Sequence, residues 1–183
     1  MSRFTKNILY ILLYGIIFFL IEKFISFTGV ISYLNFSYSQ PVMVFLSIIQ
    51  PPLVGGLGAA LGSFLIQIGG NGYDWIMILC FFINCASIGW GMRNQKVNKG
   101  FFERREISRF FKIQLVSNFV TWWLIYPLLS LLIYHTDLKT ALDEGFRSAL
   151  GYFISDMLIS TLFLTLYAQS RFSKANLEII SSC

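Results

Sequence analysis

Residue types that carry enzyme chemistry are sparse in this sequence. His135 is the only histidine, and no G-x-S-x-G turn accompanies it, so a Ser-His-Asp triad has little support. The sequence contains neither an H-E-x-x-H helix nor a G-x-x-x-x-G-K-[ST] phosphate loop. Cys80, Cys85 and Cys183 are an odd number without metal-ligand spacing, which predicts no disulfide framework, zinc site or cofactor. These patterns indicate a protein that is not an enzyme.

A few polar side chains lie inside long apolar runs. Asp156 is the only acid well inside such a run, and Asn84, Asn118 and Gln67 are the amides placed similarly. Burying these groups in lipid is costly, so they normally face other helices or a cavity. For Asn84 and Asn118, interhelical hydrogen bonding and ligand contact are equally open. For Asp156 we expect either substrate contact or a role in helix packing and coupling.

Aromatic and polar residues gather in segments that we expect to lie in the outer half of the molecule. Trp122 and Tyr126, at i and i+4, share one helix face, and Trp123 points away from it. An interfacial aromatic belt is one interpretation, and a pocket with apolar walls and a few polar groups is the other. The candidate substrate-binding residues are Tyr33, Asn35, Tyr38, Gln40, Gln67, Asn71, Asp74, Trp75, Asn118, Trp122, Tyr126, Tyr134, His135 and Tyr152.

The composition of the 183 residues indicates where these groups lie. Hydrophobic residues make up 56% and charged residues only 13%, whereas a soluble domain carries about 25% charged residues. The chain therefore has too little polar surface for a soluble enzyme, a disordered tail or a nucleic-acid reader. We predict an all-α integral membrane protein that forms one domain over residues 1–183.

Six apolar segments are candidates for helices that cross the membrane, which takes about 20 apolar residues. Ser39 is the predicted N-cap of the second segment, and Pro51-Pro52 ends it. The join to the third segment is open, because residues 41–69 could form one long broken helix. The segments run over residues 7–24, 38–50, 53–69, 75–92, 110–134 and 146–168.

Basic residues supply an independent prediction of topology. With the N-terminus inside, the cytoplasmic pieces are residues 1–6, a basic loop over 93–109 that extends to Lys112, and a tail over 171–183. They hold all of the 14 Lys and Arg residues except Lys23, Lys139 and Arg147. The positive-inside rule then predicts six spans with both termini in the cytoplasm.

Small residues in the third segment predict close helix packing. Gly58-x-x-x-Gly62, with Gly55 and Ala59 on adjacent faces, allows two backbones to approach. The contact is either intramolecular or a docking surface for another membrane subunit. The candidate docking residues are Gly15, Gly55, Gly58 and Gly62.

The order of several short motifs resembles a known family. Residues 51–62 read PPLVGGLGAALG, Gly72-Tyr73-Asp74-Trp75 precedes the fourth segment, and Pro127-Leu128-Leu129 lies in the fifth. Across residues 7–170 the pattern resembles the substrate-binding S components of energy-coupling factor (ECF) vitamin transporters. The nearest branch is the riboflavin-transporter-like group of uncharacterised and vitamin-precursor S components.

The resemblance implies a division of labour between subunits. It implies that this chain binds a water-soluble vitamin at the outer face of a bacterial plasma membrane. A coupling membrane subunit and two ATPases would drive uptake. Many S components carry an A-x-x-x-A docking patch on the first helix, where this chain offers only Gly15. The docking surface is therefore expected to differ or to extend to the second and third helices.

The aromatic outer half points to a flat heterocyclic ligand. Within the family, that favours hydroxymethylpyrimidine (a thiamine precursor) or pyridoxine, with cobalamin as a bulkier alternative. Few basic residues lie on the outer side, so an unphosphorylated form is expected. Two other functions remain open: a small secondary transporter or channel that uses Asp156, and an accessory membrane subunit without transport activity.

Overall fold

The computed structural model describes the whole chain except residues 1, 26–35, 69–73, 94–96, 98–99 and 182–183. Within the described residues the chain is helical and contains no strand. The first four predicted segments correspond to α1 (Arg3–Ile25), α2 (Ser39–Ile49), α3 (Pro52–Ile68) and α4 (Trp75–Met92). Their apolar runs are thus confirmed as helices.

The last two predicted segments form continuous helical rods that are longer than expected. The fifth consists of α5 (Arg104–Asn118), the π-helical η2 (Phe119–Ile125) and α6 (Tyr126–Tyr134). The sixth consists of α7 (Leu138–Ser155), the π-helical η3 (Asp156–Ser160) and α8 (Thr161–Ser181). The expected starts at residues 110 and 146 are too late, because polar turns at both rod beginnings are helical as well. Asp137 begins the sixth rod as an N-cap whose side chain accepts from the amides of Lys139 and Thr140.

Length and composition allow four of these segments to cross a membrane. They are Arg3–Phe24, Trp75–Met92, Arg104–Tyr134 and Leu138–Ser173, and the apolar helices Ser39–Ile49 and Pro52–Ile68 are shorter. The number of membrane crossings and the side on which each terminus lies stay predictions.

The join between α2 and α3 is a sharp break and not a bent helix. Gln50, which precedes two prolines, is extended with φ −118° and ψ 175°. The predicted N-cap Ser39 instead lies in the first turn of α2. Tyr38 is the N-cap and makes no side-chain capping bond, and Ser37 before it accepts from the amide of Gln40 through Oγ at 3.3 Å.

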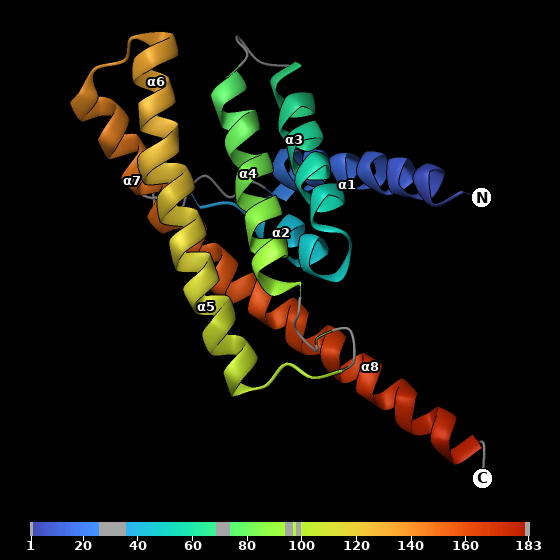
Figure 1. Cartoon of the computed structure of the whole chain (residues 1–183). Helices are drawn as coiled ribbons and strands as arrows, with labels where there is room; N and C mark the ends of the chain where they lie inside the picture. Colours follow the sequence, from blue (N-terminus) through green and yellow to red (C-terminus); the bar gives the residue numbers. More distant parts are fainter. Residues whose placement is uncertain (1, 26–35, 69–73, 94–96, 98–99, 182–183) are drawn as a thin grey trace.

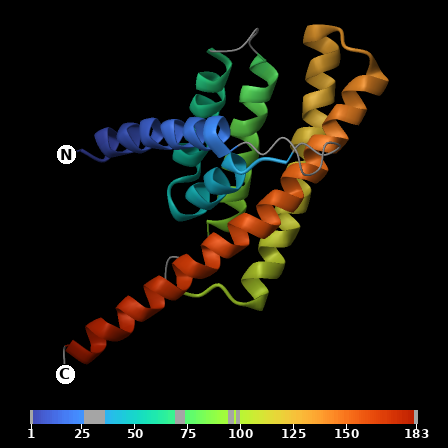
Figure 2. The same ribbon diagram turned by 180° about the vertical axis from the view of Figure 1, so that it is seen from behind.

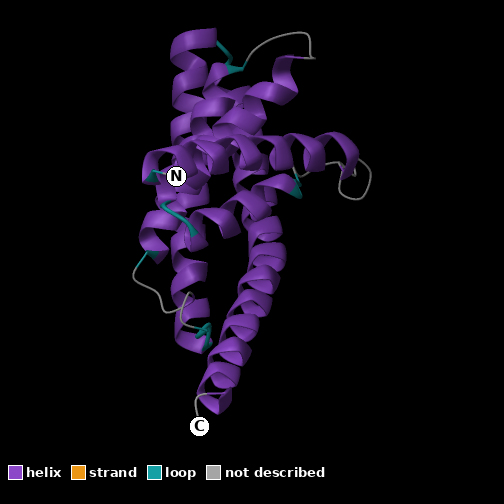
Figure 3. Cartoon of the chain, turned by 90° about the vertical axis from the view of Figure 1, so that its right-hand side faces the viewer, coloured by secondary structure: helices purple, strands orange, loops and turns teal. Residues whose placement is uncertain are grey.

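Helices α3 and α4 stand side by side, and α1 crosses them at a steep angle (Figure 1). Seen from behind, α1 lies in front of α3, and the short α2 lies below α1 (Figure 2). The two long rods run beside this group, and α8 continues past it to the C-terminus (Figure 3). The core where the groups meet combines aliphatic side chains with aromatic ones that include Phe18, Phe81, Trp122 and Tyr152.

Candidate functional site

A cavity of about 440 Å³ lies between α1, α4, η2 and α7. Three predicted binding residues line it: Trp122, Tyr126 and Tyr152. Its other lining residues are Glu22, Phe36, Ser37, Met77, Glu144, Arg147 and Ser148. The cavity has the volume and the mixed lining of a small-molecule site.

Trp122, Tyr126 and Tyr152 form an aromatic wall on one side of the cavity. The rings of Trp122 and Tyr152 have centroids 4.6 Å apart, and those of Trp122 and Tyr126 are 6.0 Å apart. Phe81 packs behind the wall, edge-on to Trp122 at 5.0 Å. Trp122 is only 1% exposed, and its indole Nε1 has no hydrogen-bond acceptor among the described residues. The wall is therefore largely buried, with Tyr126 as its half-buried member, and its central side chain carries a buried donor.

Local helix geometry helps to position the wall. Trp122 lies within η2, a π-helical stretch, and Tyr126 begins α6 immediately after it. Such stretches shift the register of side chains and are frequent at functional sites. Pro127 follows Tyr126, and its ring lies where a side chain on Gly145 of α7 would collide. The absence of a side chain at Gly145 therefore lets α7 approach the wall closely.

Glu22 carries a carboxylate to the cavity from the end of α1. Its Oε2 accepts hydrogen bonds from Ser39 Oγ at 2.6 Å and from Ser37 Oγ at 3.2 Å. The two serine hydroxyls also contact each other at 2.9 Å. These bonds join α1 to the start of α2 and fix one carboxylate oxygen at the cavity edge.

The α7 side of the cavity carries mixed charge. Glu144, Arg147 and Ser148 line it, and Arg147 forms an ion pair with Asp143 one turn earlier on the same helix. This end can therefore provide donors and acceptors from adjacent turns of one helix.

Two other predicted residues, Gln40 and Asn118, belong to a buried polar network. Gln40 Nε2 donates to Asn118 Oδ1 at 3.3 Å and to Asp156 Oδ2 at 3.1 Å. Asn118 Nδ2 donates to the same Asp156 oxygen at 3.1 Å, and Asn84 Nδ2 donates to Asn118 Oδ1 at 3.1 Å. All four side chains are fully buried. The network joins α2, α4, α5 and η3, so interhelical bonding is one established role of Asn84, Asn118 and Asp156.

A separate cluster holds Gln67, Asp74, Trp75 and Tyr134 near the ends of α3, α4 and α6. Gln67 Oε1 accepts from the Asp74 amide at 2.6 Å, and Tyr134 Oη accepts from the Trp75 amide at 3.1 Å. Asp74 caps α4 by accepting from the Met77 amide at 3.0 Å. Trp75 is 60% exposed and stacks on Phe64 at 6.1 Å. None of these residues lines the cavity.

The remaining predicted binding residues are dispersed. Tyr38 is half-buried with its ring against Phe36, 5.4 Å away. His135 is exposed at the end of α6, in the left-handed conformation with φ 52°. Three more, Tyr33, Asn35 and Asn71, lie outside the described residues.

The glycines predicted for partner docking lie at helix contacts within the chain. A side chain at Gly58 or Gly62 of α3 would collide with Tyr14 or Phe18 of α1. Gly55 faces Ser47 of α2, and Gly15 faces Leu61 of α3. These positions therefore take part in intramolecular packing, and docking of another subunit at this face stays a prediction.

Sequence reasoning missed the acidic residues of the cavity. Glu22 lies near the end of the first apolar run, where an ionisable residue is itself a signal of function. Glu144 precedes the expected start of the sixth segment at residue 146, whereas Arg147 and Ser148 lie in its first turn without having been singled out as binding residues. A search of the described residues finds no group of three or more His, Cys, Asp and Glu side chains that could hold a metal ion.

Known proteins share this pattern over nearly the whole chain. The family model described as "ECF-type riboflavin transporter, S component" matches residues 4–169. The chain belongs to this family. Membership makes it a subunit of a vitamin-type transporter and not an enzyme. It also places the apolar helices in a membrane-embedded protein, as their composition predicted.

Several relatives of this S component carry the name UPF0397 protein. The protein from Clostridium perfringens (strain SM101) is 28% identical over 174 residues, or 94% of each chain. The protein from Enterococcus faecalis is 27% identical over 175 residues, covering 95% of this chain and 96% of its own. A Staphylococcus aureus (strain JH9) relative is 25% identical over 95% of each chain. Their shared name states no substrate, and no solved structure shows significant similarity to this chain.

Proposed function

We propose that this chain is the high-affinity substrate-binding subunit of an ECF-type importer and that its vitamin binds in the cavity beside Trp122. The observation that carries the proposal is the aromatic wall of Trp122, Tyr126 and Tyr152 on a cavity of about 440 Å³. The wall combines residues from two rods with polar groups from α1 and α7, which is the usual lining of a small-molecule site.

The cavity supports a ring-sized vitamin over a cobalamin-sized one. Its volume lies in the lower part of the range of about 300–1,000 Å³ that small-molecule sites occupy. Ring faces gain about 0.5–1.5 kcal/mol beyond buried area when they stack on another aromatic ring. Hydroxymethylpyrimidine and pyridoxine are the candidates. Among the described lining residues, the one basic side chain, Arg147, is paired with Asp143, which favours an unphosphorylated form.

Transport then depends on partners in the membrane. We infer six spans with cytoplasmic termini in a bacterial plasma membrane, because the basic residues fall on one side in that arrangement. A coupling membrane subunit and two ATPases would supply the energy. We expect the partner subunits to dock on exposed side chains of this chain, because the glycines of α3 are in contact with α1 and α2.

The test is a titration of the purified protein with a panel of vitamins, in which binding is measured by calorimetry or by tryptophan fluorescence. Trp122→Ala should weaken binding of the active vitamin about tenfold or more, because it removes the centre of the wall. Trp123→Ala is the matched control, since Trp123 is 46% exposed, packs against Phe119 and Phe146, and does not line the cavity. Tyr126→Ala provides a second cavity variant if Trp122→Ala does not fold.

The outcomes separate clearly. Weakening by the cavity variants but not by Trp123→Ala supports the site. If both folded cavity variants keep the affinity within about twofold, the vitamin does not bind here. Co-purification tests the subunit role independently, because this chain should be isolated with an ATPase pair and a second membrane protein.

A further inference from the structure

Glu22 is an acid that lines the cavity from the end of α1. It receives hydrogen bonds from Ser37 and Ser39, both on the same oxygen, Oε2. Within the part of the chain that the structure describes, no Lys or Arg forms an ion pair with it. The neighbouring Lys23 instead lies over the ring of Phe19, 5.3 Å from its centroid. The second carboxylate oxygen, Oε1, receives no hydrogen bond from the described residues.

Such an arrangement needs an explanation beyond packing. An ionisable side chain in an apolar helix is costly and normally pairs with another group. Two serine hydroxyls stabilise a carboxylate, but they leave its charge uncompensated. Glu22 lines the cavity, so a bound molecule can reach it from that side.

The rest of the cavity lining also favours a positively charged ligand. Glu144 adds a second carboxylate to the lining, and Arg147, the one cation among the lining residues that the structure describes, is paired with Asp143. The faces of Trp122 and Tyr152 attract cations through the negative potential of their rings. The buried indole Nε1 of Trp122, which has no acceptor among the described residues, can also donate to a ring heteroatom.

We propose that the cavity selects a flat heteroaromatic molecule that carries a protonated amine. The amine pairs with Glu22, while the ring lies against Trp122 and Tyr152. The inference rests on the proposed function and narrows the class of ligand. A cavity of this kind should bind a ring with an aminomethyl substituent more tightly than the same ring with a hydroxymethyl substituent. A carboxylate that only tied α1 to α2 would show no such preference.

Matched ligand pairs test the charge without changing the ring. The first pair is pyridoxamine and pyridoxine, and the second is the aminomethyl and hydroxymethyl forms of 4-amino-2-methylpyrimidine. An aliphatic amine of this kind is protonated at neutral pH. Calorimetry on the full chain in detergent should show the aminomethyl member of at least one pair binding about tenfold or more tightly than its partner.

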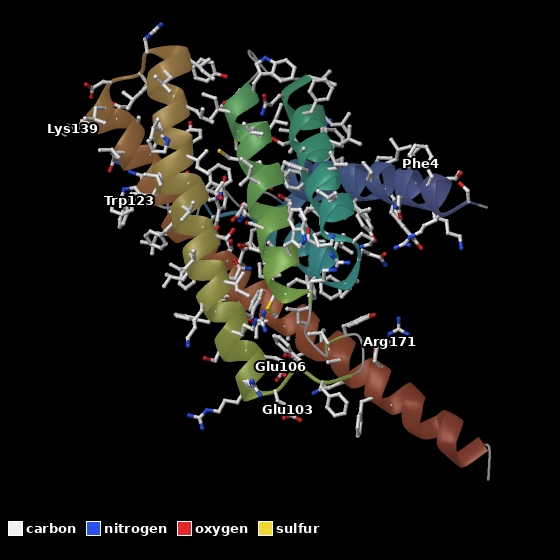
Figure 4. The ribbon with its side chains drawn as sticks, viewed as in Figure 1. Phe4, Glu103, Glu106, Trp123, Lys139 and Arg171 are labelled. Atoms are coloured by element: carbon white, nitrogen blue, oxygen red, sulfur yellow. The ribbon has the colours of Figure 1, made fainter. Side chains whose placement is uncertain are left out.

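Glu22→Gln then assigns that preference to one side chain. Glutamine can still accept from Ser37 and Ser39, so α1 and α2 stay joined while the charge is lost. The variant should lower affinity for the aminomethyl member about tenfold and bring the two members within about twofold of each other. Glu103→Gln is the control, because Glu103 lies at the far end of the rods and should leave the ratio unchanged (Figure 4).

Three results would overturn the inference. The wild-type protein could bind the hydroxymethyl member as tightly as the aminomethyl one, which would leave the S-component role intact. The preference could persist in Glu22→Gln, which would assign it to another group. If no member of either pair bound, the assignment of the cavity to a small cationic ring would fall, whereas co-purification with the transporter subunits would still test the proposed function.

Discussion

Asn118 at the end of α5 donates a hydrogen bond of 3.1 Å from Nδ2 to Oδ2 of Asp156, the first residue of η3. Gln40 Nε2 reaches the same carboxylate oxygen at 3.1 Å from α2. The pair therefore joins both long rods and the short helix at a point where all three side chains are fully buried. The buried position makes the carboxylate the centre of the helix arrangement below the cavity wall.

This relationship predicts a large loss of stability for one substitution of Asp156 and a small change for another. Asp156→Ala removes the acceptor of two interhelical bonds, each worth about 0.6 kcal/mol in membrane proteins, and leaves a small cavity. We expect the free energy of unfolding to fall by about 1–2 kcal/mol. Asp156→Asn keeps an acceptor oxygen and the side-chain shape, so the change should stay below about 0.5 kcal/mol.

The buried thiols of Cys80 and Cys85, both 0% exposed, provide the measurement. A thiol-reactive fluorophore reports unfolding when heating exposes them. If Asp156→Ala melted at or above the wild-type temperature, the cost of burying the carboxylate would exceed the value of its bonds.

Close packing between α1 and α3 predicts a second pair of effects. Gly62→Ala places a Cβ against Phe18, whose own Cβ is the nearest atom and cannot rotate away. We expect a loss of about 1–3 kcal/mol, as in other overpacked cores. Gly91→Ala in α4 is the matched control. Its added Cβ lies 2.9 Å from the flexible end of Ile113, and alanine gains about 0.8–1.0 kcal/mol of helix propensity over glycine.

The same melting assay compares these two variants. Equal destabilisation of Gly62→Ala and Gly91→Ala would contradict the packing argument. A Gly62→Ala variant that keeps its melting temperature but no longer co-purifies with a second membrane protein would instead assign this face to partner docking.

Hydropathy predicts the helices of this chain well because apolar runs in a membrane protein are sufficient to define them. Hydropathy does not predict where the two rods begin. The sixth rod begins at the N-cap Asp137 and continues through polar turns, which depend on capping and not on hydropathy. Side-chain composition also cannot separate Trp75, 60% exposed, from Trp122, 1% exposed. That difference arises when η2 packs against α7, a contact between segments distant in the sequence.

The residues of the site are even harder to predict from the sequence, because they come from distant segments. Gln40 and Asp156 are separated by 116 positions, so no local pattern predicts that they share a hydrogen bond. Glu22 and Ser39 are 17 positions apart and meet only because α1 crosses the bundle. The aromatic wall was predictable in part, because Trp122 and Tyr126 share a face by helical spacing alone.

Membrane topology yields a third prediction. Lys139 lies at the end of the molecule formed by α6 and α7, and Glu103 lies at the opposite end (Figure 4). If six spans place both termini inside, Lys139→Cys should react with an impermeant maleimide in intact cells, whereas Glu103→Cys should react only after permeabilisation. Both substitutions use exposed residues. Reaction of both from the same side would refute the six-span arrangement.

Energy supply provides the last prediction. The sequence has no G-x-x-x-x-G-K-[ST] loop to hold nucleotide phosphates, so this chain has no recognisable means of coupling ATP hydrolysis to movement of its ligand. Proteoliposomes that contain the chain alone should bind radiolabelled pyridoxine or pyridoxamine but show no ATP-driven accumulation. Adding the coupling subunit and the ATPase pair should start uptake, and Trp122→Ala should reduce it through weaker binding. ATP-driven accumulation by the isolated chain would contradict its assignment as a binding subunit. Accumulation driven by a proton gradient, and lost in Asp156→Asn, would instead identify a secondary transporter that uses the buried carboxylate.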